Sequence, residues 1–282
     1  MTLAALFPAL ATHINQPQGP LPQRLDARVT VQRDLVHTPA GVPPLLVDVY
    51  APDLPGPLPA VLMIHGGAWA KGTRRQTASL ARRVARRGYV VVNTTYRLAP
   101  AALFPAQVLD VQQAVRWMRA NAASLRIDAA RIGAWGYSAG AHLAAMLGGL
   151  GPGDRLYAQD ARVAAVVAGG IPADLRKFRG GTIVPQFLGE KWARDSVLFR
   201  ESSPAAYVVA GAAPVFLYHG TWDKLVPLDQ SVDYQQALQA AGVPNELYLM
   251  HGFGHITAYF FDGETTRRGA DFLDRYLGQR SA

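Results

Sequence analysis

The sequence predicts an α/β protein with a central, mostly parallel sheet and helices on both faces of that sheet. From residue 60 onward, short apolar runs alternate with segments of helix length. The apolar runs lack polar alternation, which indicates strands buried on both faces, as in parallel sheets. Half of the 282 residues are hydrophobic and no Ser/Gly linker divides the chain, so we expect residues 1–282 to form a single domain with a large core.

The elements can be assigned in order. After a Pro-rich extension over residues 1–26, VTVQRDLV and LLVDVYAP predict an antiparallel strand pair around the turn HTPAGVPP. Parallel strands are expected at AVLMIHGG, YVVVNTTY, RIGAWGYS, VAAVVAGG, PVFLYHG and NELYLMHG. Helices are expected near 75–87, 105–121, 139–149, 228–241 and 264–277. Residues 174–213 break this rhythm, and we interpret them as an insertion or lid-like segment above the sheet.

Composition limits the classes of function. The formal net charge is +8, and the densest basic cluster runs from Arg74 to Arg87. Leu80 and Val84 recur there at helical spacing, so we expect the arginines on the solvated face of an amphipathic helix and no nucleic-acid partner. The chain has no cysteine, which excludes disulfides and thiol chemistry. The opening residues lack the basic segment of a secretion signal, and we expect a cytoplasmic protein without membrane insertion.

The segment WGYSAGAHLAAML contains a Gly-x-Ser-x-Gly motif centred on Ser138. The motif follows a predicted strand and begins a predicted helix, which is the context that a nucleophile elbow requires. In such a turn the serine has a strained backbone, and Gly136 and Gly140 leave room for the neighbouring backbone. The alternative is a glycine-rich helix cap without a chemical role. The context favours Ser138 as a nucleophile.

A second motif, HGGAW, follows the predicted strand AVLMI at residues 65–69. Backbone N–H groups held near a carbonyl oxygen stabilise the negative charge that acyl transfer develops there. We expect Gly67 and Ala68, together with Ala139 after the serine, to supply these donors. The sequence leaves open which two of residues 66–68 point inward. His65 is expected to hydrogen-bond within the loop and not to act as a base.

A serine nucleophile needs a histidine base, and the histidine needs an acid to orient it. Asp223 in HGTWDKLVP and His255 in MHGFGHI each follow a predicted strand, so both are expected at the carboxyl edge of the sheet, beside Ser138. Several rivals are weaker. Asp229 is expected in the first turn of a helix, where a carboxylate favours the helix dipole. His219 and His251 are interpreted as partly buried structural residues, and His142 as a packing residue that points away from the serine.

HGGAW, YRLAP, GYSAGAHLAA, HGTWDKLVP and GFGH together resemble the α/β-hydrolase superfamily, specifically its serine esterases and lipases with an HGG-type oxyanion loop. The order Ser, Asp, His is also that of the superfamily. GYSAGAHLA is more similar to the feruloyl-esterase-like and kynurenine-formamidase-like branches than to the hormone-sensitive-lipase branch, whose elbow usually reads GDSAG and whose loop usually reads HGGG. The resemblance covers residues 30–278 and implies an α/β-hydrolase fold with Ser138, Asp223 and His255 as its triad. Arg97 in YRLAP matches a family position that we interpret as structural.

The residues and the resemblance imply a carboxylic-ester hydrolase that forms an acyl-enzyme on small or aromatic acyl esters, with no cofactor and no metal. Trp69, Tyr137, Phe187 and Trp192 are the candidate aromatic walls of its substrate pocket. An arylformamidase-like amide hydrolase is the alternative, because the same triad cleaves activated amides. A ligand-binding protein on a hydrolase scaffold is a third hypothesis, which predicts a damaged triad. The expected partner is a small-molecule ester, and the sequence leaves monomer and dimer open.

Overall fold

The computed structural model describes residues 27–38, 43–193 and 196–278, so the predicted extension over residues 1–26 lies outside the described residues. Its strands are β1 (Val29–Val36), β2 (Leu46–Pro52), β3 (Leu58–Ile64), β4 (Val90–Thr94), β5 (Ile127–Tyr137), β6 (Val166–Gly169), β7 (Val215–Gly220) and β8 (Asn245–Met250). They form one sheet in the order β1-β2-β4-β3-β5-β6-β7-β8. β1 and β2 are antiparallel to their neighbours, and the six strands β3 to β8 are parallel to one another. The predicted α/β class and mostly parallel sheet are confirmed.

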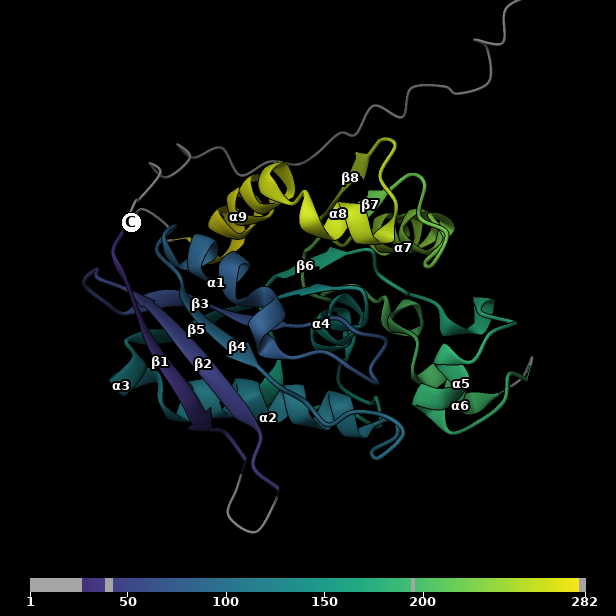
Figure 1. The fold of residues 1–282 in the computed structure, drawn as a ribbon, viewed down its shortest axis with the longest axis horizontal. Helices are drawn as coiled ribbons and strands as arrows, with labels where there is room; N and C mark the ends of the chain where they lie inside the picture. Colours follow the sequence, from purple (N-terminus) through teal and green to yellow (C-terminus); the bar gives the residue numbers. More distant parts are fainter. Residues whose placement is uncertain (1–26, 39–42, 194–195, 279–282) are drawn as a thin grey trace, which may run out of the picture.

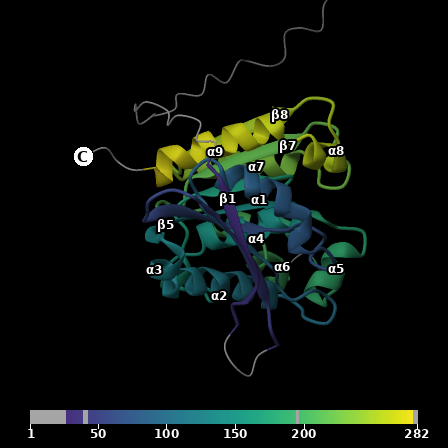
Figure 2. The ribbon, with the colours of Figure 1, turned by 60° about the vertical axis from the view of Figure 1, so that its left-hand side comes forward.

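The α-helices are α1 (Ala78–Ala85), α2 (Ala106–Ala120), α3 (Ala122–Leu125), α4 (Ala139–Gly149), α5 (Ile183–Leu188), α6 (Val197–Glu201), α7 (Asp229–Ala240), α8 (His255–Phe260) and α9 (Gly263–Leu277). Helices α1 and α9 cover one face of the sheet, and α2, α4 and α7 cover the other (Figures 1 and 2). None of the helices in the described part of the chain is long and apolar enough to span a membrane.

Burial on both faces explains the continuous apolar strands. In β3, Leu62 and Ile64 pack into the core beneath α2 and α4, whereas Val61 and Met63 pack into the core beneath α1 and α9. All four side chains are fully buried. Because strands β3 to β8 run parallel, the loops that follow them meet at one edge of the sheet. Polar side chains from distant parts of the sequence come together at this edge.

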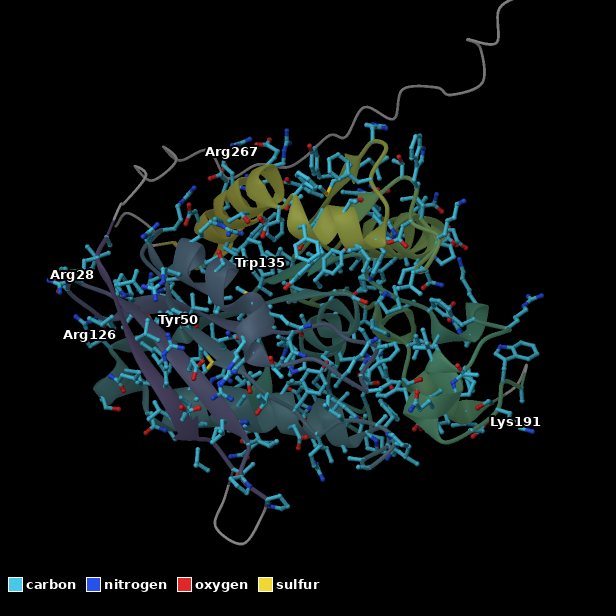
Figure 3. The ribbon with its side chains drawn as sticks, viewed as in Figure 1. Arg28, Tyr50, Arg126, Trp135, Lys191 and Arg267 are labelled. Atoms are coloured by element: carbon cyan, nitrogen blue, oxygen red, sulfur yellow. The ribbon has the colours of Figure 1, made fainter. Side chains whose placement is uncertain are left out.

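The arginines of α1 and of the two residues that follow it are less solvated than the sequence predicts. Leu80 and Val84 are buried as expected, and Arg86 is exposed. Arg83, however, pairs with Asp262, and Arg87 bridges two aspartates of α9 at 2.7 Å each. Half of this face is therefore an ion-paired contact between two helices. Elsewhere the charge is peripheral: Arg28, Arg126, Lys191 and Arg267 stand at the surface, while Trp135 lies in the interior (Figure 3).

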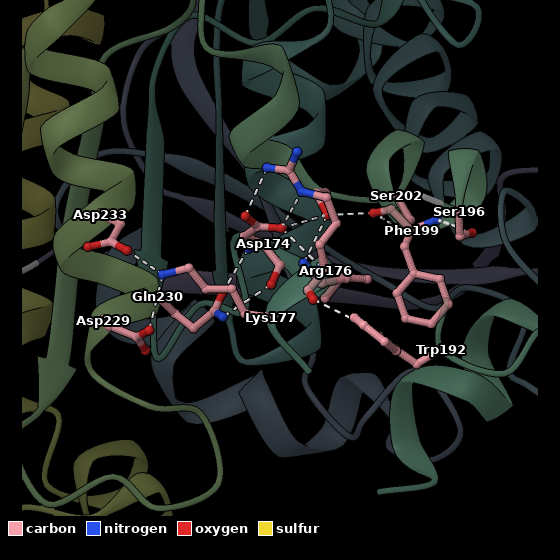
Figure 4. Close-up of polar contacts among 12 residues, drawn as sticks. Asp174, Arg176, Lys177, Trp192, Ser196, Phe199, Ser202, Asp229, Gln230 and Asp233 are labelled. Carbon is pink, nitrogen blue, oxygen red and sulfur yellow. Dashed lines mark hydrogen bonds and ion pairs between the residues drawn. The ribbon is translucent and has the colours of Figure 1, made fainter. Parts of the chain in front are cut away.

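The predicted insertion over residues 174–213 contains α5, α6 and two short 3₁₀ helices, η3 (Leu175–Lys177) and η4 (Pro204–Tyr207). Its start is bound to α7. The Asp174 N–H donates to Gln230 Oε1 at 2.7 Å, and Gln230 Nε2 donates back to the Asp174 carbonyl at 3.1 Å. Lys177 adds ion pairs to Asp229 and Asp233 (Figure 4). These contacts fix one end of the insertion against the sheet domain.

Candidate active site

Ser138 lies in the tight turn between β5 and α4, with φ 56° and ψ −123°. An L-residue rarely adopts this backbone conformation, so the turn is strained as the sequence predicts. A Cβ built on Gly136 would lie 2.2 Å from the backbone of Gly140, and one built on Gly140 would lie 2.1 Å from the Ile64 carbonyl oxygen. The glycines of the motif are therefore required by close backbone contacts.

The loop after β3 packs against this turn. A Cβ on Gly66 would lie 2.9 Å from the Tyr137 carbonyl oxygen and 3.4 Å from Ser138 Cβ. Gly67, Ala68 and Trp69 all have positive φ, at 120°, 54° and 57°. Within the described chain, no protein group accepts a hydrogen bond from the N–H of Ala139 or from those of residues 66–68. Among the described residues, these amide hydrogens are therefore left without an acceptor.

Asp223 and His255 are in direct contact at the same edge of the sheet. His255 Nδ1 donates to Asp223 Oδ2 at 2.6 Å, and the other carboxylate oxygen accepts the N–H groups of Leu225 and Val226 at 2.9 and 2.8 Å. Burial by itself raises the pKa of Asp223, but hydrogen bonds from His219, His255 and a backbone N–H outweigh burial and hold that pKa well below its usual range. A carboxylate only accepts, so His255 Nδ1 carries the proton and Nε2 is left as the basic nitrogen.

Contacts through Gly170 and Tyr137 bring His255 close to the turn that carries Ser138. The Ser138 N–H donates to the Gly169 carbonyl at 2.8 Å, and a Cβ on the next residue, Gly170, would lie 3.1 Å from His255 Cε1. The Tyr137 hydroxyl donates to the His255 carbonyl at 2.6 Å. No hydrogen bond joins Ser138 Oγ to the His255 ring among residues 27–38, 43–193 and 196–278. Such contacts are often long before a substrate binds.

His142 and His65 both have structural contacts. His142 is fully buried and uses both ring nitrogens, toward Trp69 Nε1 at 3.2 Å and the Ser202 carbonyl at 2.6 Å. Burial lowers its pKa to about 4, so the ring is neutral near pH 7. His65 Nδ1 donates to the carbonyl of Gly66 at 2.8 Å, within its own loop. The packing role predicted for His142 and the loop contact predicted for His65 are both confirmed.

The remaining rivals for the roles of acid and base differ in their surroundings. His219 is buried and contacts Ser231 Oγ at 2.6 Å. Its Nε2 lies 3.4 Å from Asp223 Oδ2, so it helps to hold the Asp223 carboxylate in place. Asp229 starts α7 as predicted and pairs with Lys177. The prediction for His251 was wrong, because this side chain is exposed. The turn that follows β8 carries it outward, away from the sheet core.

Two of the four candidate pocket walls, Phe187 and Trp69, have almost no exposed surface, which corrects the prediction for both. Phe187 is 0% exposed and Trp69 is 2% exposed, and the two rings stack with their centroids 4.3 Å apart, so each ring covers a face of the other. Tyr137 faces His255 and lines a cavity of about 220 Å³ near α1 and α8. Trp192 is partly buried, and its Nε1 donates to the Arg176 carbonyl at 2.9 Å inside the insertion (Figure 4).

Three contacts in the site are not evident from the motifs. They are the Tyr137 hydroxyl on the His255 backbone, His219 beside Asp223, and the bond from Trp69 to His142. In the sequence, Tyr137 stands next to Ser138 and His219 stands four residues before Asp223. These positions are the only signals for the first two contacts, and the third has none. Arg97 binds Asp110 through several hydrogen bonds of 2.7 to 3.0 Å, which confirms its structural role. Among the described residues, no group of three His, Asp or Glu side chains is placed to hold a metal ion.

Comparison with known proteins agrees with this fold. Residues 47–238 match the BD-FAE family model. The chain is 31% identical to esterase LipQ of Mycobacterium tuberculosis, over 95% of this chain and 67% of LipQ. It is 32% identical to a probable isoprenylcysteine alpha-carbonyl methylesterase, ICMEL1, of Oryza sativa, over 80% of this chain and 57% of that protein. The chain thus spans between about half and two thirds of the length of such relatives.

Solved structures give the same result. A truncated carbohydrate esterase from gut microbiota superposes with a TM-score of 0.78 at 25% identity, over 92% of this chain and 99% of that one. Esterase Est2 of Thermogutta terrifontis superposes with a TM-score of 0.73 at 25% identity, over 93% and 97%. The fold and these relatives define a carboxylesterase-type α/β-hydrolase. Within that class, the chain belongs to the BD-FAE family.

Proposed function

We propose that this protein hydrolyses carboxylic esters of small or aromatic acids by a two-step acyl transfer on Ser138. The observation that carries the proposal is the 2.6 Å hydrogen bond from His255 Nδ1 to Asp223. It leaves Nε2 of the same ring as a base at the sheet edge where Ser138 occupies its strained turn. The named esterases among the relatives support the reaction class.

In the first step, Ser138 Oγ attacks the ester carbonyl carbon while His255 Nε2 takes the hydroxyl proton. The negative charge that develops on the carbonyl oxygen is stabilised by the N–H of Ala139 and by two N–H groups of residues 66–68, at about 3 kcal/mol for each donor. His255 then gives its proton to the leaving alcohol oxygen as the carbon–oxygen bond breaks. Asp223 stays ionised throughout and stabilises the imidazolium.

In the second step, a water molecule gives a proton to His255 Nε2 and attacks the acyl-enzyme, which releases the acid and restores Ser138. Support for small acyl groups comes from Trp69, the last residue of the HGGAW loop, whose ring is 2% exposed. Its indole is held between the His142 ring, 5.0 Å away, and the Phe187 ring, 4.3 Å away. A buried ring that is fixed in this way cannot move aside, so it limits the room for a large acyl group near residues 66–68.

The test uses p-nitrophenyl esters of increasing chain length, a feruloyl ester, an acetylated sugar and N-formylkynurenine. We expect wild type to hydrolyse at least the short esters, and Ser138→Ala to lower kcat by about 10⁴ or more. Ser124→Ala, at an exposed serine of α3, is the matched control and should leave kcat unchanged. A fluorophosphonate probe should label wild type and Ser124→Ala but not Ser138→Ala.

Other outcomes contradict parts of the proposal. Equal turnover by Ser138→Ala would remove this serine from the reaction. Preference for N-formylkynurenine over every ester would indicate an amide hydrolase with the same residues. A folded protein that turns over none of the compounds would favour ligand binding on a hydrolase scaffold.

A further inference from the structure

Large apolar side chains surround the residues assigned as acid and base. Trp222 directly precedes Asp223 and is 72% exposed, and Ile256 directly follows His255 and is 62% exposed. Three further side chains of these two segments are exposed to between 49% and 71% of their area. We call the set the apolar rim: Trp222, Leu225, Ile256, Phe260 and Phe261. A water-soluble protein rarely exposes several large apolar groups together unless they contact something.

The apolar rim is continuous across the two segments. The N–H of Trp222 donates to the Phe253 carbonyl at 2.9 Å, and the Phe253 ring lies 5.8 Å from the Phe261 ring. Ile256 and Phe260 are four residues apart on α8, so they share one helix face. Both segments follow parallel strands, β7 and β8, and therefore lie at the carboxyl edge with Ser138.

Three exposed cations lie at the same carboxyl edge of the sheet as the apolar rim. Lys224 lies two residues after Trp222, and Lys71 donates its N–H to the Gly67 carbonyl at 3.0 Å behind the oxyanion loop. Arg75 lies next to Gln76, whose carbonyl accepts the Tyr259 hydroxyl of α8 at 2.7 Å. None of these three cations forms an ion pair with a described residue, and the chain carries a net charge of +8. The surface around the site combines apolar area with uncompensated positive charge.

We propose that the apolar rim docks this protein on an anionic lipid surface. Aromatic and aliphatic side chains bury their area at the boundary between head groups and acyl chains, and flanking Lys and Arg side chains attract anionic lipids. Docked in this way, the carboxyl edge faces the lipid, so an ester held in the bilayer reaches Ser138 without crossing water. The docking surface is separate from the reaction proposed above and requires no turnover.

The test is co-sedimentation with phosphatidylcholine vesicles that contain about 30% phosphatidylglycerol, at low and high salt. Wild type should sediment with these vesicles and less at high salt, and weakly with pure phosphatidylcholine. The double variant Trp222→Ser/Phe261→Ser should lower the partition coefficient by about tenfold or more. Lys71→Gln/Lys224→Gln should lower binding only to the anionic vesicles. Val209→Ser is the matched control, because Val209 is 51% exposed but lies before β7, at the opposite edge of the sheet.

Two readouts separate docking from hydrolysis. Ser138→Ala should sediment as wild type does, and Trp222→Ser/Phe261→Ser should keep wild-type turnover of a water-soluble acetate ester, which also shows that it folds. Equal sedimentation of the double variant and wild type would overturn the proposal, as would failure of wild type to sediment. A dimer of wild type in light scattering that the double variant loses would assign the apolar rim to a second copy of the chain instead.

Discussion

Trp69 Nε1 donates a 3.2 Å hydrogen bond to His142 Nδ1, and the opposite nitrogen of that imidazole donates to the Ser202 carbonyl at 2.6 Å. The indole N–H only donates and the carbonyl only accepts, so His142 is neutral with its proton on Nε2. Trp69 ends the HGGAW loop after β3, His142 belongs to α4 and Ser202 belongs to the insertion. The buried His142 ring therefore links this loop to α4 and to the insertion. Ala68 and Trp69 in the loop both have positive φ.

We predict that His142→Gln destabilises the protein and slows it. Glutamine cannot satisfy both partners in the imidazole geometry, and an unpaired buried polar group should lower the free energy of unfolding by about 2 kcal/mol. The strained loop residues Ala68 and Trp69 then lose a fixed contact, so kcat should fall by about tenfold. Urea unfolding and ester hydrolysis measure the two effects. His251→Gln, at an exposed histidine, should change neither, and equal effects of the two variants would contradict this assignment.

The same residue predicts a dependence of stability on pH. Burial lowers the pKa of His142 to about 4 in the folded state, below its ordinary value of 6.5, so the unfolded chain binds the additional proton. The free energy of unfolding therefore keeps its full value above about pH 6.5. It falls as the pH drops toward 4, by about 3 kcal/mol in total. Urea unfolding between pH 7.5 and 4.5 should therefore show a steeper loss for wild type than for His142→Gln. Parallel curves would mean that another group causes the loss.

Asp223→Asn tests the acid assigned to His255. Asparagine keeps the shape of aspartate but has no negative charge to stabilise the imidazolium. If its NH2 group faces Nδ1, it also disfavours the required tautomer of His255, so kcat should fall by about 10³ or more. Asp229→Asn is the matched control six residues later. Asp229 is exposed and pairs only with Lys177 among the described residues, so its loss should leave kcat within about twofold. A larger effect at Asp229 than at Asp223 would reverse the assignment.

Much of the fold follows from local patterns in the sequence. The helix expected over residues 139–149 begins and ends at those residues, and VTVQRDLV forms β1 without adjustment. Such segments carry strong signals, because their apolar residues follow the period of one element. The contact between Asp223 and His255 was also predictable, since both follow parallel strands that must end at the same edge.

Other features depend on contacts between distant segments. Helices α5, α6 and α8 are five or six residues long, too short for a periodic pattern, and were not predicted. Arg83 and Arg87 show helical spacing in the sequence, but only the approach of α9 turns them into ion pairs. The complete burial of Phe187 likewise results from the way in which the insertion folds onto Trp69.

Gly140→Ala gives the sharpest test of the strained turn. Within a helix, replacing glycine by alanine normally stabilises by about 0.5 to 1 kcal/mol. At Gly140 the new methyl group would lie 2.1 Å from the carbonyl oxygen of Ile64 and 2.7 Å from that of His65, and both belong to backbone that cannot move without disturbing β3. We expect the free energy of unfolding to fall by about 3 kcal/mol or more, measured by urea unfolding. Gly180→Ala is the control, because no heavy atom lies within 4 Å of its added Cβ, and it should change stability by less than about 0.5 kcal/mol. If Gly140→Ala were as stable as wild type, the backbone of the elbow would not be held against β3, and the strain at Ser138 would have another origin.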